Sequence, residues 1–157
     1  MRYYQINSLL SSQMIKFDKL MIYTDGGARG NPGPAACGVV IKDKEEVILE
    51  VSEYIGNATN NQAEYEALIL ALHKAKELFA HKRMGPGSIE CHLDSELVVK
   101  QLNREYKIKN EGLKPLFIKV INLIPEFDSV RFIHIPREKN KLADKLVNKE
   151  LDSHEKM

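Results

Sequence analysis

The middle of the chain contains one long amphipathic segment, and its apolar stripe begins with a glutamate. Read at about 3.6 residues per turn, the pattern predicts a helix over residues 60–81 whose buried face starts at Glu64. The same face continues through apolar side chains at helical spacing, namely Leu68, Ala71, Leu72, Ala75 and Phe79. An ionised carboxylate that is buried without a partner is costly. The fold must therefore bring a positive charge or a metal ion to Glu64.

Two apolar segments, one on each side of this helix, stop at an aspartate. The first, Leu20–Thr24, reads as a strand buried on both faces and is followed by Asp25. The second, residues 88–94, alternates in polarity and ends at Asp94. Because a helix connects them, we expect the two strands to pair in parallel through a right-handed crossover. Both aspartates would then lie at the sheet edge where open α/β sheets bind ligands.

The remaining pattern completes an α/β domain. A hairpin and a final strand are expected at residues 37–42, 47–55 and 130–135. Further helices are expected at residues 95–102, 113–123 and 140–151. The segment Gly26–Ala36 is dense in glycine and proline and reads as a loop. Residues 1–18 show no strong pattern, so we expect an N-terminal extension before a catalytic domain at residues 19–153.

Length and composition indicate one core and a reducing environment. A chain of 157 residues, 43% of them hydrophobic, is long enough for one buried core and too short for two ordinary domains. Its two cysteines, Cys37 and Cys91, lie in strand-like segments, which fits buried thiols in a reducing compartment. No stretch reads as a signal peptide or a membrane span. We therefore expect a cytoplasmic protein that binds no membrane.

Charge is unevenly distributed along the chain. Residues 100–149 contain twelve Lys or Arg and six Asp or Glu, although the whole chain carries a net charge of only +1. A basic half on a nearly neutral protein suggests that a polyanion docks on one side. A solvated lysine-rich surface would give the same composition, so charge alone does not separate the two.

A fourth acid, Asp144, lies at the edge of the apolar stripe of the last predicted helix. Together with Asp25, Glu64 and Asp94 it can reach one small volume at the same sheet edge. Four carboxylates there would repel one another unless divalent cations neutralised them, and hard oxygen ligands select Mg²⁺ or Mn²⁺ over Zn²⁺. The sequence thus predicts a metal site. Helix capping or surface ion pairing could explain each acid singly, but not their convergence.

Four motifs surround these acids. They are Thr24–Gly27 with Gly30–Gly33, Thr59–Glu64, Asp94–Val98, and Asn140 with Ala143–Asp144. Over residues 20–150 they resemble type 1 ribonuclease H, and the short loop at residues 103–111 is similar to archaeal and some bacterial members that lack a basic protrusion. The resemblance implies the ribonuclease H-like fold, an α/β fold with a five-stranded mixed sheet of order 3-2-1-4-5 flanked by helices.

The resemblance also implies an activity. Members of this family are endonucleases that hydrolyse the RNA strand of RNA/DNA hybrids and leave 5′-phosphate and 3′-hydroxyl ends. They use two Mg²⁺ ions, which Mn²⁺ can replace, in a two-metal in-line displacement. By position, Asp25 would bridge both ions, and Asp144 would complete the coordination of the ion that activates water. Glu64 and Asp94 would complete the coordination of the ion that stabilises the leaving oxygen.

Substrate contacts are implied in the same way. Three amides match positions that contact the minor groove and ribose 2′-hydroxyls: Asn31, Asn60 and Asn61. Three residues of the basic loop look like phosphate contacts to the partner strand: Lys107, Lys109 and Asn110. Glu96 replaces a substrate-contacting glutamine of many members. An auxiliary catalytic role, in proton transfer or product release, is expected for Arg137 rather than for His134, which reads as a strand residue.

Two other functions share much of this pattern. A module that binds the hybrid without cleaving it would need an incomplete set of the four carboxylates, whereas all four acids are present. A strand-transferring relative, such as an integrase or transposase core, would lack the Asn60–Gln62 and Gly30–Gly33 features and normally carries extra domains. We therefore expect a hybrid-cleaving monomer whose partner is the RNA/DNA duplex, and nothing in the sequence implies a protein partner.

Overall fold

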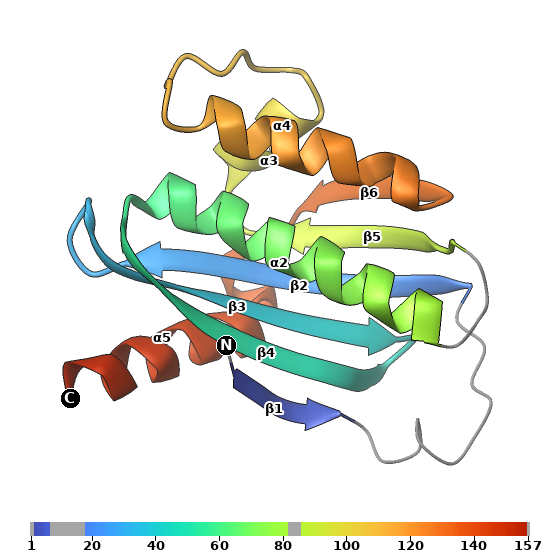
Figure 1. Ribbon diagram of the computed structural model, residues 1–157, viewed down its shortest axis with the longest axis horizontal. Coiled ribbons are helices and arrows are strands. Elements are labelled where there is room, and N and C mark those ends of the chain that lie inside the picture. Colours follow the sequence, from blue (N-terminus) through green and yellow to red (C-terminus); the bar gives the residue numbers. More distant parts are fainter. Residues whose placement is uncertain (1, 7–17, 82–85, 157) are drawn as a thin grey trace.

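A six-stranded sheet with helices on both faces forms the structure, a computed structural model that describes residues 2–6, 18–81 and 86–156 (Figure 1). The strands are β1 (Arg2–Ile6), β2 (Lys19–Ala28), β3 (Gly33–Asp43), β4 (Glu46–Ala58), β5 (Ser88–Leu93) and β6 (Ser129–His134). The helices are α2 (Asn60–His81), α3 (Glu96–Leu102), α4 (Lys114–Leu123) and α5 (Lys141–Glu155), with 3₁₀ turns at Ile124–Glu126 and Arg137–Lys139. Among these described helices, none is both long and apolar enough to cross a membrane.

The strand order is β1-β4-β3-β2-β5-β6. From β4 to β6 this is the predicted order 3-2-1-4-5, so the expected five-stranded mixed sheet is confirmed. β2 pairs in parallel with β5, from Lys19↔Ser88 to Thr24↔Leu93, as a right-handed crossover through α2 requires. β3 pairs antiparallel with both of its neighbours, β2 and β4. The carboxyl ends of β2 and β5 therefore meet at one edge of the sheet.

β1 was not expected from the sequence. It pairs antiparallel with β4, from Arg2↔Ser52 to Ile6↔Leu49, and becomes the outermost strand. Its five residues show no regular alternation of polarity, so the sequence gives no indication of a strand there. The pairing comes from the open edge of β4, which offers unpaired backbone groups to any nearby segment. The rest of the predicted extension up to residue 17 lies outside the described residues.

The segment Gly26–Ala36, predicted as a loop, is mostly strand, so that prediction was wrong. β2 continues to Ala28 and β3 begins at Gly33, with Ala28↔Ala35 as the last pair of their ladder. Only residues 29–32 form the turn. Gly26 serves the close packing of α2 against β2, whereas Gly30, with a φ of +95°, lies in the turn.

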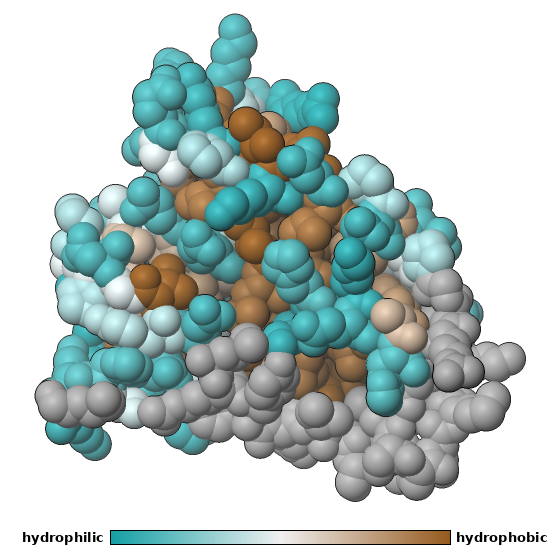
Figure 2. Space-filling view, in the orientation of Figure 1, coloured by the Kyte–Doolittle hydropathy of each residue, from teal (hydrophilic) through white to brown (hydrophobic). Residues whose placement is uncertain are grey.

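The helices bury the predicted apolar faces. α2 packs over β2 and β3 on one face of the sheet, and α5 covers β3 from the opposite face (Figure 1). Thr59 caps α2, because its Oγ1 accepts from the N–H of Gln62 at 3.1 Å and its own N–H donates to the Gln62 side chain at 2.9 Å. The predicted stripe of α2 is buried, Glu64 included. α4 packs on α2, and Figure 2 shows hydrophobic surface in the strip between them.

Candidate active site

Carboxylates from four parts of the chain line one pocket of about 380 Å³ at the carboxyl ends of β2 and β5. They are Asp25 in β2, Glu64 in α2, Asp94 directly after β5, and Asp144 in α5. Asp25, Glu64 and Asp94 each place one oxygen within 4.8 Å of the other two. Asp144 lies at the exposed rim, where its charge and a hydrogen bond act on Asp25. The structure thus brings the four acids together around a shared centre.

Close packing of α2 against β2 sets the position of Glu64. A Cβ atom on Gly26 would lie 2.1 Å from the carbonyl oxygen of Ala63, so glycine alone fits there. Ala63 directly precedes Glu64, and the backbone N–H of Gly26 donates to the Glu64 carboxylate. Since Gly26 directly follows Asp25, this contact brings Glu64 beside Asp25.

A second glycine has the same effect on α5. A Cβ atom on Gly38 of β3 would lie 2.4 Å from the carbonyl oxygen of Ala143. Gly38 pairs with Asp25 across the β2–β3 ladder, and Ala143 directly precedes Asp144. A larger side chain at Gly38 would therefore displace α5 from the sheet and Asp144 from Asp25.

Burial makes full ionisation of this cluster unfavourable. Burial, followed by the negative charge of Asp94, raises the pKa of Asp25 to about 7. Burial also raises the pKa of Glu64 well above its usual value, and the charges of Asp25 and Asp94 add to that shift. Acids that share an interior volume in this way are stable in their charged forms only when a cation compensates them.

The carboxylate of Glu64 shows where a cation would fit. Its Oε2 atom is buried and accepts no hydrogen bond within the described part of the chain. A buried oxygen of this kind costs free energy unless a donor or a cation meets it. The cluster offers carboxylate oxygens only, which suit Mg²⁺ or Mn²⁺ better than Zn²⁺. The residues present therefore fit a divalent metal site.

Asn140 holds one of these acids in place. Its Nδ2 donates to Oδ2 of Asp94 and to the carbonyl oxygen of Thr24, both at 2.8 Å. The side chain is 2% exposed, so water competes little for these bonds. In the sequence Asn140 stands out only as part of a motif, and no role was predicted for it. An asparagine just before a helix reads as an N-cap, but this side chain makes no capping bond.

The predicted substrate-contacting asparagines lie beside the acids. Asn60 and Asn61, in the first turn of α2, line the carboxylate pocket. Oδ1 of Asn60 accepts from the N–H of Ala28 at 2.8 Å, and Oδ1 of Asn31 accepts from the N–H of Asn60 at 3.0 Å. Asn31 itself is exposed in the turn after β2. The amide oxygens thus fix the turn to α2, which brings all three side chains to one place.

The same turn is also tied to the end of α5. The guanidinium of Arg29 pairs with Asp152 and with Glu155, each at 2.7 Å. Its Nη2 also lies 3.4 Å from Oδ1 of Asn148. This link was not predicted from the sequence, because Arg29 and α5 are far apart in the chain and the acids read as ordinary surface residues.

A second hollow adjoins the asparagines. Asn61 lines it together with the predicted phosphate contacts Lys107, Lys109 and Asn110, and its volume is about 530 Å³. The loop at residues 103–111 that carries them contains no regular helix or strand, as expected. The structure therefore places these basic residues in a groove that borders the carboxylate pocket through Asn61.

The two candidates for an auxiliary catalytic role differ in position. Arg137, in the 3₁₀ turn after β6, lines the carboxylate pocket. His134 is an exposed residue at the end of β6 and is not among the residues that line it. Glu96 is exposed at the start of α3 and pairs with Lys100 at 2.9 Å, so its carboxylate is already engaged.

Comparison with known proteins finds relatives that match most of this chain. A family model described as reverse transcriptase-like matches residues 23–150. The chain is 38% identical over 137 residues to a bifunctional protein of Mycobacterium tuberculosis, covering 86% of this chain and 36% of that protein. It is 41% identical over 131 residues to ribonuclease HI of Halobacterium salinarum, covering 83% of this chain and 63% of that protein. The chain thus spans less than two thirds of the length of either relative.

Solved structures match over a greater share of their length. LC11-RNase H1, isolated from compost by a metagenomic approach, is 48% identical with a TM-score of 0.81, covering 88% of this chain and 99% of that chain. A structure of LC11-RNase H1 in complex with an RNA/DNA hybrid matches with a TM-score of 0.79, also at 48% identity, covering 86% of this chain and 98% of that chain. The likeness therefore extends over almost the whole of that protein.

Proposed function

This chain belongs to the type 1 ribonuclease H family, and from that premise we propose that it is a metal-dependent endonuclease that hydrolyses the RNA strand of RNA/DNA hybrids. The observation that carries the proposal is the buried Oε2 of Glu64, which has no hydrogen-bond partner among the described residues and lies in a cluster with Asp25 and Asp94. Such a cluster calls for divalent cations. The likeness to LC11-RNase H1, solved with a hybrid, supports the choice of substrate.

Two Mg²⁺ ions, which Mn²⁺ can replace, suit the four carboxylates. Asp25 would be the residue shared by both ions, because its carboxylate interacts with each of the other three acids. Glu64 and Asp94 would then complete the coordination of one ion, and Asp144 would complete that of the other. The ions supply Lewis acidity and electrostatic stabilisation at the reacting phosphate.

The chain needs no nucleophile of its own for this reaction. Water attacks the phosphorus in line and gives up a proton, while the bond to the 3′-oxygen breaks and that oxygen takes up a proton. The products carry 5′-phosphate and 3′-hydroxyl ends. Arg137 lines the pocket and carries a fixed positive charge, so it can stabilise the phosphate and assist the release of product. This auxiliary role is proposed for Arg137 rather than His134 because of that position.

Recognition of the hybrid divides between two sets of residues. The Nδ2 groups of Asn31 and Asn60 can serve as donors to a ligand, since the hydrogen bonds described above engage the oxygens of these side chains. Amide donors beside the acids, with Asn61, can bond the ribose 2′-hydroxyl that distinguishes RNA from DNA. Lys107 and Lys109, with Asn110, can hold phosphates of the partner strand in the adjoining groove.

Residues 19–153 are proposed as the catalytic unit, acting as a monomer on the hybrid. One chain supplies all four acids of the pocket, so no second copy is needed to complete it. The two free cysteines, Cys37 and Cys91, are buried, which agrees with a reducing, cytoplasmic setting.

The proposal is tested by incubating the protein with end-labelled RNA/DNA, RNA/RNA and DNA/DNA duplexes, each with Mg²⁺ and with a chelator. We expect cuts in the RNA strand of the hybrid, with Mg²⁺ only, and 5′-phosphate ends on the products. Binding of the hybrid without any cut would favour the binding module. Joining of DNA strands would favour the strand-transferring alternative, and either result would overturn the proposal.

A further inference from the structure

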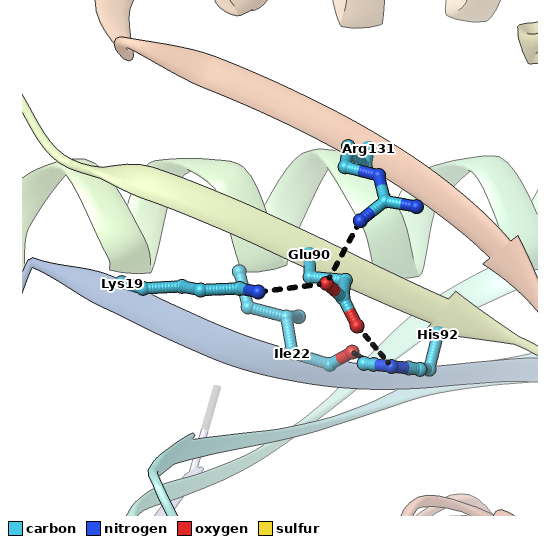
Figure 3. Close-up of polar contacts among 5 residues, drawn as sticks. All are labelled: Lys19, Ile22, Glu90, His92 and Arg131. Carbon is cyan, nitrogen blue, oxygen red and sulfur yellow. Dashed lines mark hydrogen bonds and ion pairs between the residues drawn. The ribbon is translucent and has the colours of Figure 1, made fainter.

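A buried polar network lies just before the point where the β2–β5 ladder ends and Asp25 and Asp94 follow. Its centre is His92 in β5, whose side chain is 9% exposed. Nδ1 of His92 lies 3.1 Å from the carbonyl oxygen of Ile22 in β2, and Nε2 lies 3.1 Å from Oε1 of Glu90 (Figure 3). A carbonyl oxygen can only accept, so Nδ1 carries a hydrogen and donates it to Ile22. The ring therefore links β5 to the backbone of β2.

Glu90 keeps the ring in this orientation. Its Oε2 pairs with Lys19 of β2 at 3.0 Å and with Arg131 of β6 at 3.5 Å, as Figure 3 shows. The hydrogen bond from Lys19 lowers the pKa of Glu90, so the side chain is a carboxylate at neutral pH. Charged groups from the two neighbouring strands, β2 and β6, thus hold the carboxylate beside Nε2 of His92 in place.

Stacking fixes the ring in a second direction. His92 and Tyr23 are direct partners in the parallel β2–β5 ladder. Their rings stack with centroids 4.5 Å apart and planes inclined by 12°. The Nζ of Lys42 lies 4.9 Å from the centroid of the Tyr23 ring. His92 therefore contacts β2 through its ring face and through a ring nitrogen at once.

This link lies where the sheet must resist repulsion. Thr24↔Leu93 is the last pair of the β2–β5 ladder, and Asp25 and Asp94 follow directly. Asp25 and Asp94 each place one oxygen within 4.8 Å of the other, so the two carboxylates repel each other when both are ionised. This repulsion tends to separate β2 from β5 at the end of their ladder. The bond from His92 to β2 lies two residues before Asp94, close enough to oppose that separation.

We infer that His92 is a positioning residue for the metal centre. Its bond to Ile22 and its stacking on Tyr23 hold the carboxylates of Asp25 and Asp94 at the separation that a divalent cation requires. This inference rests on the proposed function, because it concerns the same carboxylates. Its consequence is specific: loss of His92 weakens Mg²⁺ binding and leaves the affinity for the hybrid unchanged.

Two variants separate positioning from simple loss of stability. His92→Phe keeps an aromatic ring against Tyr23 but removes both polar contacts. Cys91→Ala is the matched control, since Cys91 is the neighbouring residue in β5, is fully buried in the core cluster beneath α2, and contributes only apolar volume. Both variants are expected to lower Tm. Only His92→Phe should weaken Mg²⁺ binding, on the order of tenfold as for other groups that orient metal ligands.

The measurements are Mg²⁺ titration by calorimetry without substrate, and the Mg²⁺ concentration that gives half-maximal hybrid cleavage. For His92→Phe we expect both to shift by the same factor, with KM for the hybrid at saturating Mg²⁺ equal to that of wild type. Glu90→Gln, which removes only the charge beside Nε2, should shift Mg²⁺ affinity in the same direction by a smaller factor. It serves as the second variant if His92→Phe does not fold.

The outcomes separate this inference from the proposed function. Wild-type Mg²⁺ affinity in the folded His92 or Glu90 variants, or an equal loss in Cys91→Ala, overturns the positioning role while hybrid cleavage by wild type stands. A wild-type protein that binds Mg²⁺ but does not cut the hybrid overturns the proposed function, and calorimetry still decides the role of His92. A wild-type protein that binds no Mg²⁺ overturns both.

Discussion

The side-chain amide of Asn140 donates a 2.8 Å hydrogen bond to Oδ2 of Asp94, a residue 46 positions earlier in the chain. Asn140 precedes the helix that carries Asp144, so this bond joins the acid that follows β5 to the segment that carries the last acid of the pocket. The same Nδ2 also donates to Thr24 of β2. One buried amide thus relates three of the segments from which the pocket is built.

Asn140→Ala should weaken the metal centre without removing a ligand. Asp94 would lose the donor that fixes one of its oxygens, and Mg²⁺ affinity should fall on the order of 10-fold to 100-fold. The measurement is Mg²⁺ titration followed by calorimetry and by hybrid cleavage. Asn122→Ala, at an exposed asparagine of α4, is the control and should match wild type. Unchanged Mg²⁺ dependence in Asn140→Ala would reject this role.

Asp25→Asn should abolish cleavage while leaving the fold intact. The change removes the acid that we propose to bridge two ions, and it also relieves repulsion with Asp94 and Glu64. In chelator at neutral pH the variant should therefore be more stable than wild type, and a gain of about 1 kcal/mol would raise Tm by about 2–4 °C in a chain of this size. Measurable Mg²⁺-dependent turnover in the variant would reject the bridging role.

The raised pKa of Asp25 predicts how stability varies with pH in the absence of metal. Its pKa rises from 3.8 to about 7 on folding, so between these values the folded state holds a proton that the unfolded state has released. The stabilisation is complete below about pH 4 and is lost as pH rises toward 7. Tm measured in chelator across this range should fall more steeply with pH for wild type than for Asp25→Asn. Parallel curves would contradict the shift.

The basic groove predicts the dependence of hybrid binding on salt. Lys107→Ala with Lys109→Ala should weaken binding and reduce the slope of log K against log salt by roughly 0.9 for each phosphate that the variant no longer neutralises. Lys76→Ala with Lys119→Ala removes the same charge from exposed positions on α2 and α4 and should leave the slope near that of wild type. Equal slopes for the two double variants would place the phosphate track elsewhere.

Local sequence pattern was sufficient to predict that the acids would meet, but not to predict the hydrogen bonds that hold them in place. Asp25 and Asp94 follow apolar strands, and Glu64 heads an apolar stripe, so periodicity alone predicted that they would meet. The bonds of Asn140 and the bond from His92 to Ile22 could not be predicted in this way, since each joins a side chain to backbone or carboxylate more than 40 residues away. Such bonds depend on the final approach of strands and helices, which no local pattern encodes.

The prediction of a loop at Gly26–Ala36 was wrong for a related reason. Glycine permits a turn, but it also permits an approach too close for any side chain, and the sequence does not say which use applies. Gly26 packs against the backbone of Ala63 and lies in β2, whereas Gly30, with a φ of +95°, lies in the turn. The two uses of glycine become distinguishable only when the neighbouring helix is in place.

Pairing of β1 with β4 has a consequence for how copies of this protein meet one another. β4 spans 13 residues, and on its outer side β1 occupies backbone groups that would otherwise be open. A chain shortened to begin at Lys19 would leave Leu49–Ser52 unpaired on that side, and an unpaired strand edge can pair with strands of other molecules and lead to aggregation. We therefore expect removal of Arg2–Ile6 to increase self-association of the chain, which light scattering would detect.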